Sequence, residues 1–364
     1  MLTSIRNAAL ILSVVAAATI RTGDLTTERS FHTATLLRNE KVLIAGGSAA
    51  DGLTSAELYD SASGTFSAVG RMNAPPFTRY RHTATLLRDD TVLVAGGNTT
   101  FAEVFGPATG TFTRVGDMAT PRLNATAVLL SDGRVLFVGG SVSINLLSTG
   151  TKVLEIYDPA SRQFAAFGEL REGRGSPIVV LLNDGRVLVA GGTEPTGPPK
   201  ASAEVFDPST RLSVLVGSLL VPRSDSSGTL LADGRVLIFS GQGLGVPVNS
   251  AELFDPATNS FSFAGLVGIP RSRHKATRLA DGSVLVTGGQ QFTGFPSAIE
   301  LYDAGTGSLR IDGSLNDPRA DHTATLLING QVLIAGGSTP PRGGATRSTE
   351  LFAGATRRRA VRSS

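Results

Sequence analysis

A pair of adjacent glycines recurs along the chain at intervals of 43 to 52 residues. Each pair ends a short apolar run, as in the segment DGRVLVAGG at 184–192, which has near-copies at 132–140, 281–289 and 329–337. The pairs are Gly46-Gly47, Gly96-Gly97, Gly139-Gly140, Gly191-Gly192, Gly288-Gly289 and Gly336-Gly337, and Ser240-Gly241 fills the remaining place. A period near 50 residues indicates repeated copies of one supersecondary unit.

One unit is clear in residues 82–116, which read HTATLLRDDTVLVAGG, a short loop, and AEVFGPATGTFTRVG. Tight-turn residues separate four short runs of apolar and β-branched residues, so each unit is expected to be a four-stranded antiparallel meander. A lone meander leaves apolar faces exposed, whereas a closed ring of meanders buries them against each other. The sequence therefore predicts an all-β, seven-bladed β-propeller over residues 19–356.

The repeats resemble kelch repeats. The resemblance rests on the glycine pair, on an E-x-aromatic triplet such as Glu57-Leu58-Tyr59, and on a second aromatic seven residues later, such as Phe66. The motif R-x-x-H, followed by DGRVLVAGG, is most similar to the kelch propeller of galactose oxidase and its relatives. The resemblance implies a fold and leaves the function open.

The seventh unit has no fourth strand of its own after STELF at 348–352. Residues ATIRTGDLTTERSFH at 18–32 align with the end of an ordinary unit, although Thr19 stands where other units have phenylalanine. We therefore expect residues 18–23 to close the last blade, as an N-terminal strand does in many kelch propellers.

The two ends of the chain differ from the repeats. Residues 1–18 have one basic residue, Arg6, followed by an apolar run that ends in three alanines, as a secretory signal peptide does. Residues 357–364 form a short basic tail. We predict an extracytoplasmic bacterial protein, secreted or periplasmic, that is monomeric and has no membrane span.

Composition excludes several classes of function. The chain has no cysteine, so it has neither thiol catalysis nor cysteine metal ligands. The net charge is only +3 and the body carries no basic block, so nucleic acid is not an expected partner.

An arginine precedes the first strand of every unit, and a glutamate lies in every third strand. Because the third strand is expected to be buried, each glutamate needs a partner, and a structural ion pair with the arginine of its unit is the favoured interpretation. The residues of this set are Arg29, Arg122, Arg174, Arg223, Glu57, Glu103, Glu155, Glu204, Glu252, Glu300 and Glu350. The rival interpretation is an arginine ring that binds an anion or acidic peptide, and it makes Arg79, Arg271 and Arg319 ligand candidates at the channel mouth.

All four histidines stand three residues after such an arginine: His32, His82, His274 and His322. They fall in units 1, 2, 6 and 7, which become contiguous when the ring closes, so they are ligand candidates at the channel mouth. Galactose oxidase carries a copper-binding histidine at a similar position, preceded by a tyrosine, and it needs a cysteine–tyrosine cross-link. Here the preceding residues are Phe31, Arg81, Arg273 and Asp321, and cysteine is missing, so we expect no metal and no cofactor.

The connections after the second and fourth strands must lie on one face of the ring, which we call the loop face. Two of them stand out: the long link before the second unit, with Phe77, and the loop QQFTGFPS at 290–297. Further ligand candidates on this face are Tyr80, Arg81, Gln290, Gln291 and Phe292. The favoured function is a noncatalytic module that binds a protein or glycan; the alternatives are a carbohydrate-active enzyme of the epimerase or oxidase type at the channel mouth, and a structural role.

Overall fold

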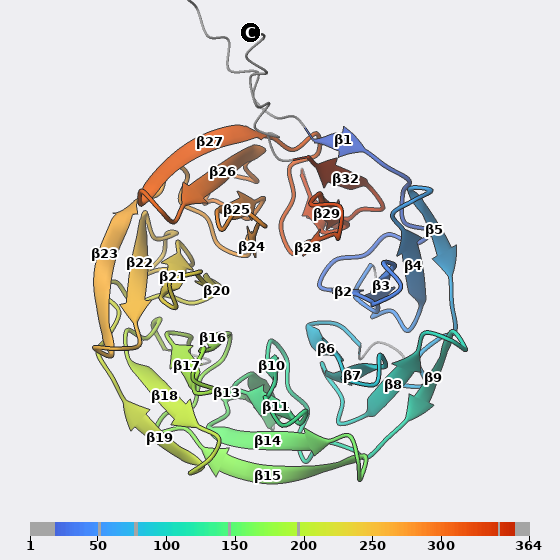
Figure 1. Cartoon of the computed structure of the whole chain (residues 1–364), viewed down its shortest axis with the longest axis horizontal. Helices are drawn as coiled ribbons and strands as arrows, with labels where there is room; N and C mark the ends of the chain where they lie inside the picture. The colour runs from blue at the N-terminus through green and yellow to red at the C-terminus, as the bar shows by residue number, and fades with distance from the viewer. Residues whose placement is uncertain are drawn as a thin grey trace, which may run out of the picture.

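The computed structural model describes residues 19–353 except 50–51, 76–78, 145–146, 195–196 and 341–342, so the predicted signal peptide and basic tail lie outside the described residues. Seven sheets of four antiparallel strands surround a central axis (Figure 1). The chain is therefore an all-β, seven-bladed propeller, as the repeats predicted.

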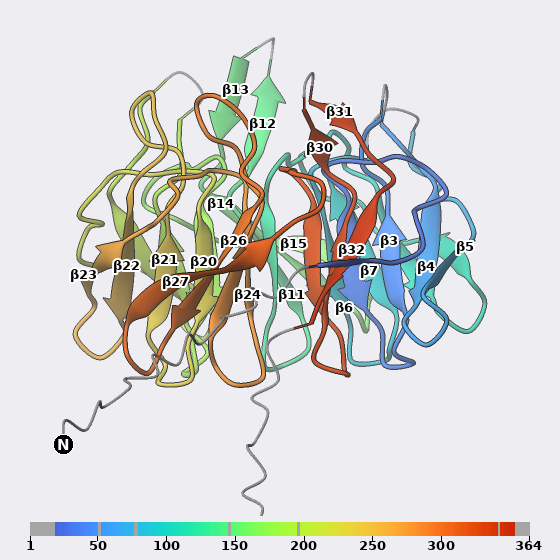
Figure 2. The same ribbon diagram turned by 90° about the horizontal axis from the view of Figure 1, so that it is seen from above.

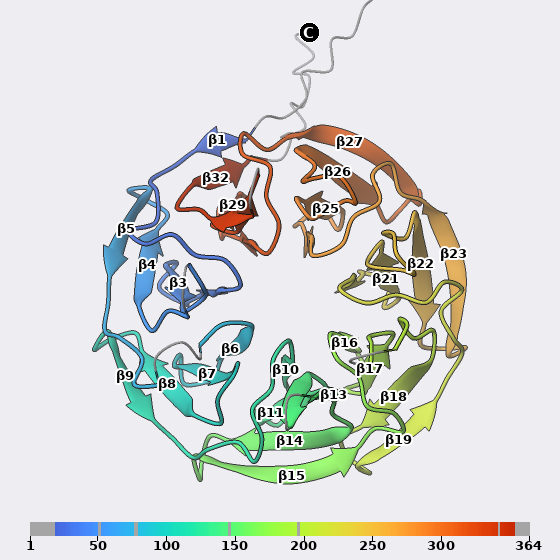
Figure 3. The ribbon, with the colours of Figure 1, turned by 180° about the vertical axis from the view of Figure 1, so that it is seen from behind.

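In each blade the strands run outward from the axis in chain order, except in the last (Figure 3). Blade 1 contains β2 (Thr33–Leu36), β3 (Val42–Ala45), β4 (Ala56–Asp60) and β5 (Thr65–Ala68). Blade 2 contains β6 (His82–Leu86), β7 (Val92–Gly96), β8 (Ala102–Gly106) and β9 (Thr111–Arg114). Blade 3 contains β10 (Thr126–Leu129), β11 (Val135–Val138), β14 (Val153–Asp158) and β15 (Gln163–Glu169). Blade 4 contains β16 (Ile178–Leu181), β17 (Val187–Ala190), β18 (Ala203–Asp207) and β19 (Leu212–Leu215).

Blade 5 contains β20 (Ser227–Leu230), β21 (Val236–Phe239), β22 (Ser250–Asp255) and β23 (Ser260–Leu266). Blade 6 contains β24 (Lys275–Arg278), β25 (Val284–Thr287), β26 (Ala298–Asp303) and β27 (Ser308–Ser314). Blade 7 contains β28 (Thr323–Leu326), β29 (Val332–Ala335), β32 (Thr349–Phe352) and β1 (Ile20–Arg21).

The core lies between the blades. The second strand of every blade is buried along both faces, which explains its continuous apolar run. One cluster, for example, packs Leu43 of blade 1 against Val92 and Phe105 of blade 2. The repeated aromatics meet across the third and fourth strands, as in Tyr59 and Phe66, whose ring centroids are 4.9 Å apart. Each blade is therefore stable only against its neighbours.

The glycine pair is required where the second strand ends. Gly288 has φ +54, and a Cβ there would lie 2.3 Å from the carbonyl oxygen of Arg319 in the next blade. The backbone conformation and the closeness of the neighbouring blade therefore both demand glycine.

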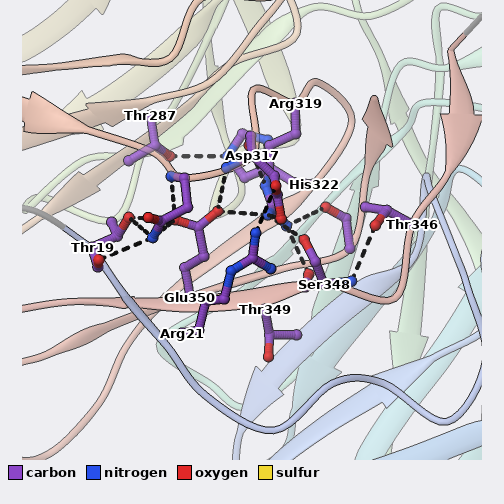
Figure 4. A network of polar contacts seen from close by, with 12 residues as sticks. Thr19, Arg21, Thr287, Asp317, Arg319, His322, Thr346, Ser348, Thr349 and Glu350 are labelled. Atoms are coloured by element: carbon purple, nitrogen blue, oxygen red, sulfur yellow. Dashed lines mark hydrogen bonds and ion pairs between the residues drawn. The ribbon is translucent and has the colours of Figure 1, made fainter. Parts of the chain in front are cut away.

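The N-terminal strand closes the ring as predicted. β1 pairs with β32 in the register Ile20 with Leu351 and Arg21 with Glu350. The Thr19 hydroxyl donates to the Glu350 carboxylate and to the Ser314 carbonyl oxygen, the latter over 3.1 Å (Figure 4). A polar contact thus takes the place of the phenylalanine that blades 1, 2, 3 and 5 have at this point.

The loop face is uneven. Its two longest connections after the second strand form hairpins, β12 (Ser141–Ile144) with β13 (Leu147–Gly150) and β30 (Ser338–Thr339) with β31 (Gly344–Ala345), which rise above the blades (Figure 2). Over the described ranges, no helix is long and apolar enough to cross a membrane.

Candidate functional site

The predicted arginine–glutamate pairs are present in every blade, and each is formed within one blade. In blade 7, Arg319 Nη2 lies 2.7 Å from Glu350 Oε1 (Figure 4). The same arginine donates to the carbonyl oxygens of Gly336 and Ser348, at 2.9 and 2.8 Å. The other pairs are Arg29–Glu57, Arg79–Glu103, Arg122–Glu155, Arg174–Glu204, Arg223–Glu252 and Arg271–Glu300.

Each glutamate also holds the link that enters its blade. Glu204, for example, accepts hydrogen bonds from the backbone N–H groups of Arg171 and Glu172, at 2.5 and 3.3 Å. The ion pairs therefore fasten the second-to-third loop and the incoming link to the same blade. This is an architectural role, repeated around the ring.

The prediction that Arg79, Arg271 and Arg319 line a ligand site is wrong. All three side chains are fully buried, and each guanidinium contacts a carboxylate of its own blade. A buried guanidinium remains stable only while its charge is paired, so these arginines are not available to a ligand.

A ring of residues two positions after these arginines surrounds the channel mouth. All seven have a left-handed backbone, with φ between 45° and 56°. They are Phe31, Arg81, Asn124, Ser176, Asp225, Arg273 and Asp321, and we call them the mouth ring. Asparagine and aspartate tolerate this conformation, but for phenylalanine, arginine and serine it costs about 1 kcal/mol or more. The backbone conformation is the same in all seven blades, and it disfavours phenylalanine, arginine and serine. The presence of these side chains therefore points to a role other than architecture.

Backbone hydrogen bonds link this ring from blade to blade. Phe31 N donates to Asp321 O, and Arg81 N donates to Phe31 O, both at 3.0 Å. Similar bonds join Asn124 to Arg81, Arg273 to Asp225 and Asp321 to Arg273. The mouth ring is thus a fixed frame that presents a different side chain at each blade.

The four histidines line the cavity at the mouth, but each is buried and its ring reaches the preceding blade. The Nε2 atoms lie 2.7–3.1 Å from hydroxyl groups: His32 near Thr323, His82 near Thr33, His274 near Ser227 and His322 near Thr287. Burial lowers the pKa of all four histidines, that of His274 to about 3. They therefore act as neutral bridges between blades.

The mouth cavity has a volume of about 260 Å³, and residues of all seven blades line it. Its charged side chains are Arg81, Arg273, Lys275, Asp225 and Asp321. Arg81 lies over the Phe31 ring, 4.3 Å from its centroid. Arg273 lies 3.9 Å from Asp321.

Lys275 and Asp321 have altered pKa values in this cavity. The side chain of Lys275 is exposed to the solvent of the channel, and the surrounding blades enclose this solvent. The resulting desolvation lowers the pKa of Lys275, while the negative charges of Asp321 and Asp225 oppose the change. Burial raises the pKa of Asp321, while Arg273 and Arg81 oppose the change. Both groups are shifted toward their neutral forms.

A groove adjoins the cavity between the loops of blades 5 and 6. It has a volume of about 340 Å³ and shares Asp225 and Arg273 with the mouth cavity. The predicted residues Gln290, Gln291 and Phe292 all line it, and Phe292 is 81% exposed. The structure thus brings these three candidates together, next to Arg273.

Two other candidates on the long link are not part of this arrangement. Tyr80 is half-buried and lines neither the mouth cavity nor the groove within the described structure. Phe77 lies outside the described residues.

The face opposite the loops also has a cavity, of about 850 Å³, between the tight turns of blades 5 and 6. Its aspartates cap their own turns: Asp233 accepts from Arg235 N at 3.0 Å, and Asp303 accepts from Gly305 N at 2.9 Å. These carboxylates serve the turns, so the smaller cavities of the loop face are the better site.

The comparisons with known proteins agree with the fold. No family model and no curated protein matches the chain. Many solved structures do match; one is a fungal alcohol oxidase of the AA5 family in complex with copper, with a TM-score of 0.76 and 16% identity over 93% of this chain and 76% of that one. At this identity the likeness shows the propeller fold alone, and membership of the kelch family stays a prediction.

The residues here do not fit a copper site of the kind that the resemblance implied. Each histidine Nε2 already contacts a hydroxyl group, and the preceding residues belong to the mouth ring and include no tyrosine. Within the described ranges, no cluster of three or more histidine, aspartate or glutamate side chains could hold a metal.

The sequence analysis did not predict the main charged residues of the mouth cavity. Asp225 and Lys275 were not candidates, and Arg273 and Asp321 were noted only as the residues before two histidines. For Asp225, Arg273 and Asp321 the signal was present: the position two residues after each repeated arginine holds five different residue types in seven units. When the residue type varies at one position of an otherwise strict repeat, the fold does not require a particular side chain there.

Proposed function

We propose that this propeller is a binding module that holds a glycan on its loop face, in the mouth cavity and the adjoining groove. The observation that carries the proposal is the junction of the two spaces at Asp225 and Arg273. A ligand that fills the mouth can extend outward between blades 5 and 6 without leaving the protein surface.

The chemistry of the groove favours a sugar. A sugar hydroxyl both donates and accepts hydrogen bonds, and the amides of Gln242, Gln290 and Gln291 can do the same. The exposed Phe292 ring supplies an apolar platform for the C–H face of a pyranose. Polar groups on a rigid frame beside an exposed aromatic ring are what a small-molecule site requires.

A glycan titration tests the proposal. Binding of plant, bacterial and animal oligosaccharides is measured by calorimetry with the wild type and with Phe292→Ala. The control is Phe263→Ala, because Phe263 is 58% exposed on β23, the outermost strand of blade 5, and does not line the groove. We expect the affinity to fall about tenfold for Phe292→Ala and to stay unchanged for Phe263→Ala. The absence of binding by any oligosaccharide, or equal effects of the two variants, would contradict the proposal.

The alternative of an enzyme at the mouth has one observation in its favour. Lys275 and Asp321 line one cavity with pKa values shifted toward neutrality, as acid–base groups need. Incubation of glycans in deuterated water tests it, because epimerisation exchanges a carbon-bound hydrogen. Exchange that is lost in Lys275→Met would support an epimerase-like activity, and the absence of exchange would favour binding alone.

The predicted export also remains a proposal. Thr19 is buried and bonded to Glu350, so a cleavage after Ala18 would leave blade 7 intact, whereas a later cleavage would remove part of its closing strand. N-terminal sequencing of the exported protein should therefore give a mature chain that begins at or before Thr19.

A further inference from the structure

Lys275 differs from every other lysine of the chain. The other three, Lys41, Lys152 and Lys200, form ion pairs with carboxylates. Lys275 lines the mouth cavity, and its ammonium group has no hydrogen bond or ion pair with any residue that the structure describes. An ammonium group enclosed by protein without a direct partner is a donor that a ligand can use.

Two carboxylates lie on either side of this lysine. Blade 5 supplies Asp225, blade 6 supplies Lys275 and blade 7 supplies Asp321, and Lys275 interacts electrostatically with both aspartates. The carboxylate of Asp225 has no hydrogen bond or ion pair within the described structure. Three successive blades therefore present an acceptor, a donor and an acceptor to one small cavity.

This order matches two neighbouring hydroxyl groups. A carboxylate only accepts and an ammonium group only donates, whereas a hydroxyl does both. One hydroxyl can donate to Asp225 and accept from Lys275, and the next can accept from Lys275 and donate to Asp321. We infer that this triplet recognises a vicinal diol of a neutral pyranose, and the inference rests on the proposed glycan-binding function.

The charge of the cavity supports a neutral ligand. Arg81, Arg273 and Lys275 are cationic, and Asp225 and Asp321 are anionic, so the charges nearly balance. A ligand carboxylate bound at Lys275 would lie beside Asp225 and Asp321, which would repel it, whereas hydroxyl groups can pair with the lysine and with both aspartates. The volume of about 260 Å³ is sufficient for one sugar ring.

The test uses methyl pyranosides of glucose, galactose and mannose, their monodeoxy analogues, and glucuronate and galacturonate. Affinities are measured by NMR titration with the wild type, Lys275→Met, Asp225→Ala and the control Lys41→Met, whose lysine pairs with Asp60 on the opposite face. Lys275 has no direct partner among the described side chains, so its replacement is expected to leave the unfolding temperature unchanged, and circular dichroism verifies this.

The expected result is binding of a neutral pyranoside that weakens about tenfold or more in Lys275→Met and Asp225→Ala but not in Lys41→Met. Removal of one hydroxyl of the diol should weaken binding to the wild type and have little further effect in Lys275→Met, because the same contact has already been lost.

Three outcomes would overturn the inference: equal affinities of the wild type and Lys275→Met, tighter binding of the uronates than of the neutral sugars, or no binding of any pyranoside. In each of these cases the glycan-binding function stands if longer oligosaccharides bind in a Phe292-dependent manner. If no glycan of any length binds, the proposed function fails as well.

Discussion

The buried histidines make the stability of the propeller dependent on pH, and His274 gives the sharpest prediction. Its Nε2 lies 2.7 Å from the Ser227 hydroxyl of blade 5, and its ring packs edge-on against Phe239 with centroids 5.5 Å apart. Burial is the largest cause that lowers its pKa to about 3, and Arg271 and Lys275 add to the effect. The native state therefore holds this histidine neutral at pH values where an unfolded chain would protonate it.

The sign and size of the effect follow from linkage. Because the pKa is lower in the folded state, the unfolded state binds more protons between pH 6.5 and pH 3, and the free energy of unfolding falls as the pH drops through this range. Each pH unit below the unfolded value of about 6.5 costs about 1.4 kcal/mol. Between pH 7.5 and pH 5.0 His274 should therefore remove about 2 kcal/mol of stability.

The assay is urea unfolding at these two pH values for the wild type and His274→Gln. Glutamine can keep a hydrogen bond to Ser227 but does not titrate, so the variant should lose about 2 kcal/mol less than the wild type on acidification. Ser226→Ala is the matched control, because Ser226 occupies the corresponding position of blade 5, and it should keep the pH dependence of the wild type. In NMR titrations, the His274 signals should show no protonation between pH 8 and pH 5.

Equal pH dependence in the wild type and His274→Gln would refute the reasoning, as would a His274 signal that titrates near pH 6. The other three histidines are buried in the same manner, with pKa values well below normal. The four together should therefore make the propeller markedly less stable in acid.

Three further predictions concern the architecture. Glu103→Gln should lower the free energy of unfolding by about 3–5 kcal/mol, measured by urea unfolding, because it leaves the buried Arg79 without its countercharge. Gly288→Ala should destabilise the protein strongly, since its Cβ would meet the next blade, whereas Gly185→Ala, also at positive φ but with open space around the Cβ, should cost only about 1–2 kcal/mol in the same assay. Deletion of residues 19–23 should expose the outer edge of β32 and lower the midpoint of thermal unfolding by several degrees, and unchanged melting would show that β1 does not stabilise blade 7.

The fold could be predicted because its determinants are local and repeated. The glycine pair, the tight turns and the apolar second strand lie within one unit, and the structure confirms the blades that they predict. The ion pairs could be predicted for the same reason, since Arg174 and Glu204 belong to one blade and one buried carboxylate needs one partner. The closing strand was harder to predict because Thr19 breaks the aromatic pattern and makes its contact with Glu350 through a hydroxyl group.

The site could be predicted only in part. Gln290, Gln291 and Phe292 stand in a loop that departs from the repeat, and they do line a groove. The repeat pattern does not predict the orientation of an arginine side chain. Only the structure shows that Arg271 is buried and that Arg273, two residues later, is exposed. Both arginines stand in the link before β24, where Arg273 has a left-handed backbone that the sequence pattern does not reveal.

Charged side chains are unevenly distributed around the mouth cavity, and this uneven distribution indicates which part of the ring forms the site. Blades 3 and 4 contribute the uncharged Asn124 and Ser176, whereas blades 5, 6 and 7 contribute every carboxylate that lines the mouth cavity, together with Lys275. The groove was found on independent grounds, from the loops outside the ring, and it opens between two of the same blades. A purely architectural ring would have no reason to place both of its carboxylates in the same sector as Phe292, the most exposed phenylalanine among the described residues. A ligand that enters the mouth from that sector meets both, so the departures from the repeat, rather than the repeat itself, carry the functional information of this chain.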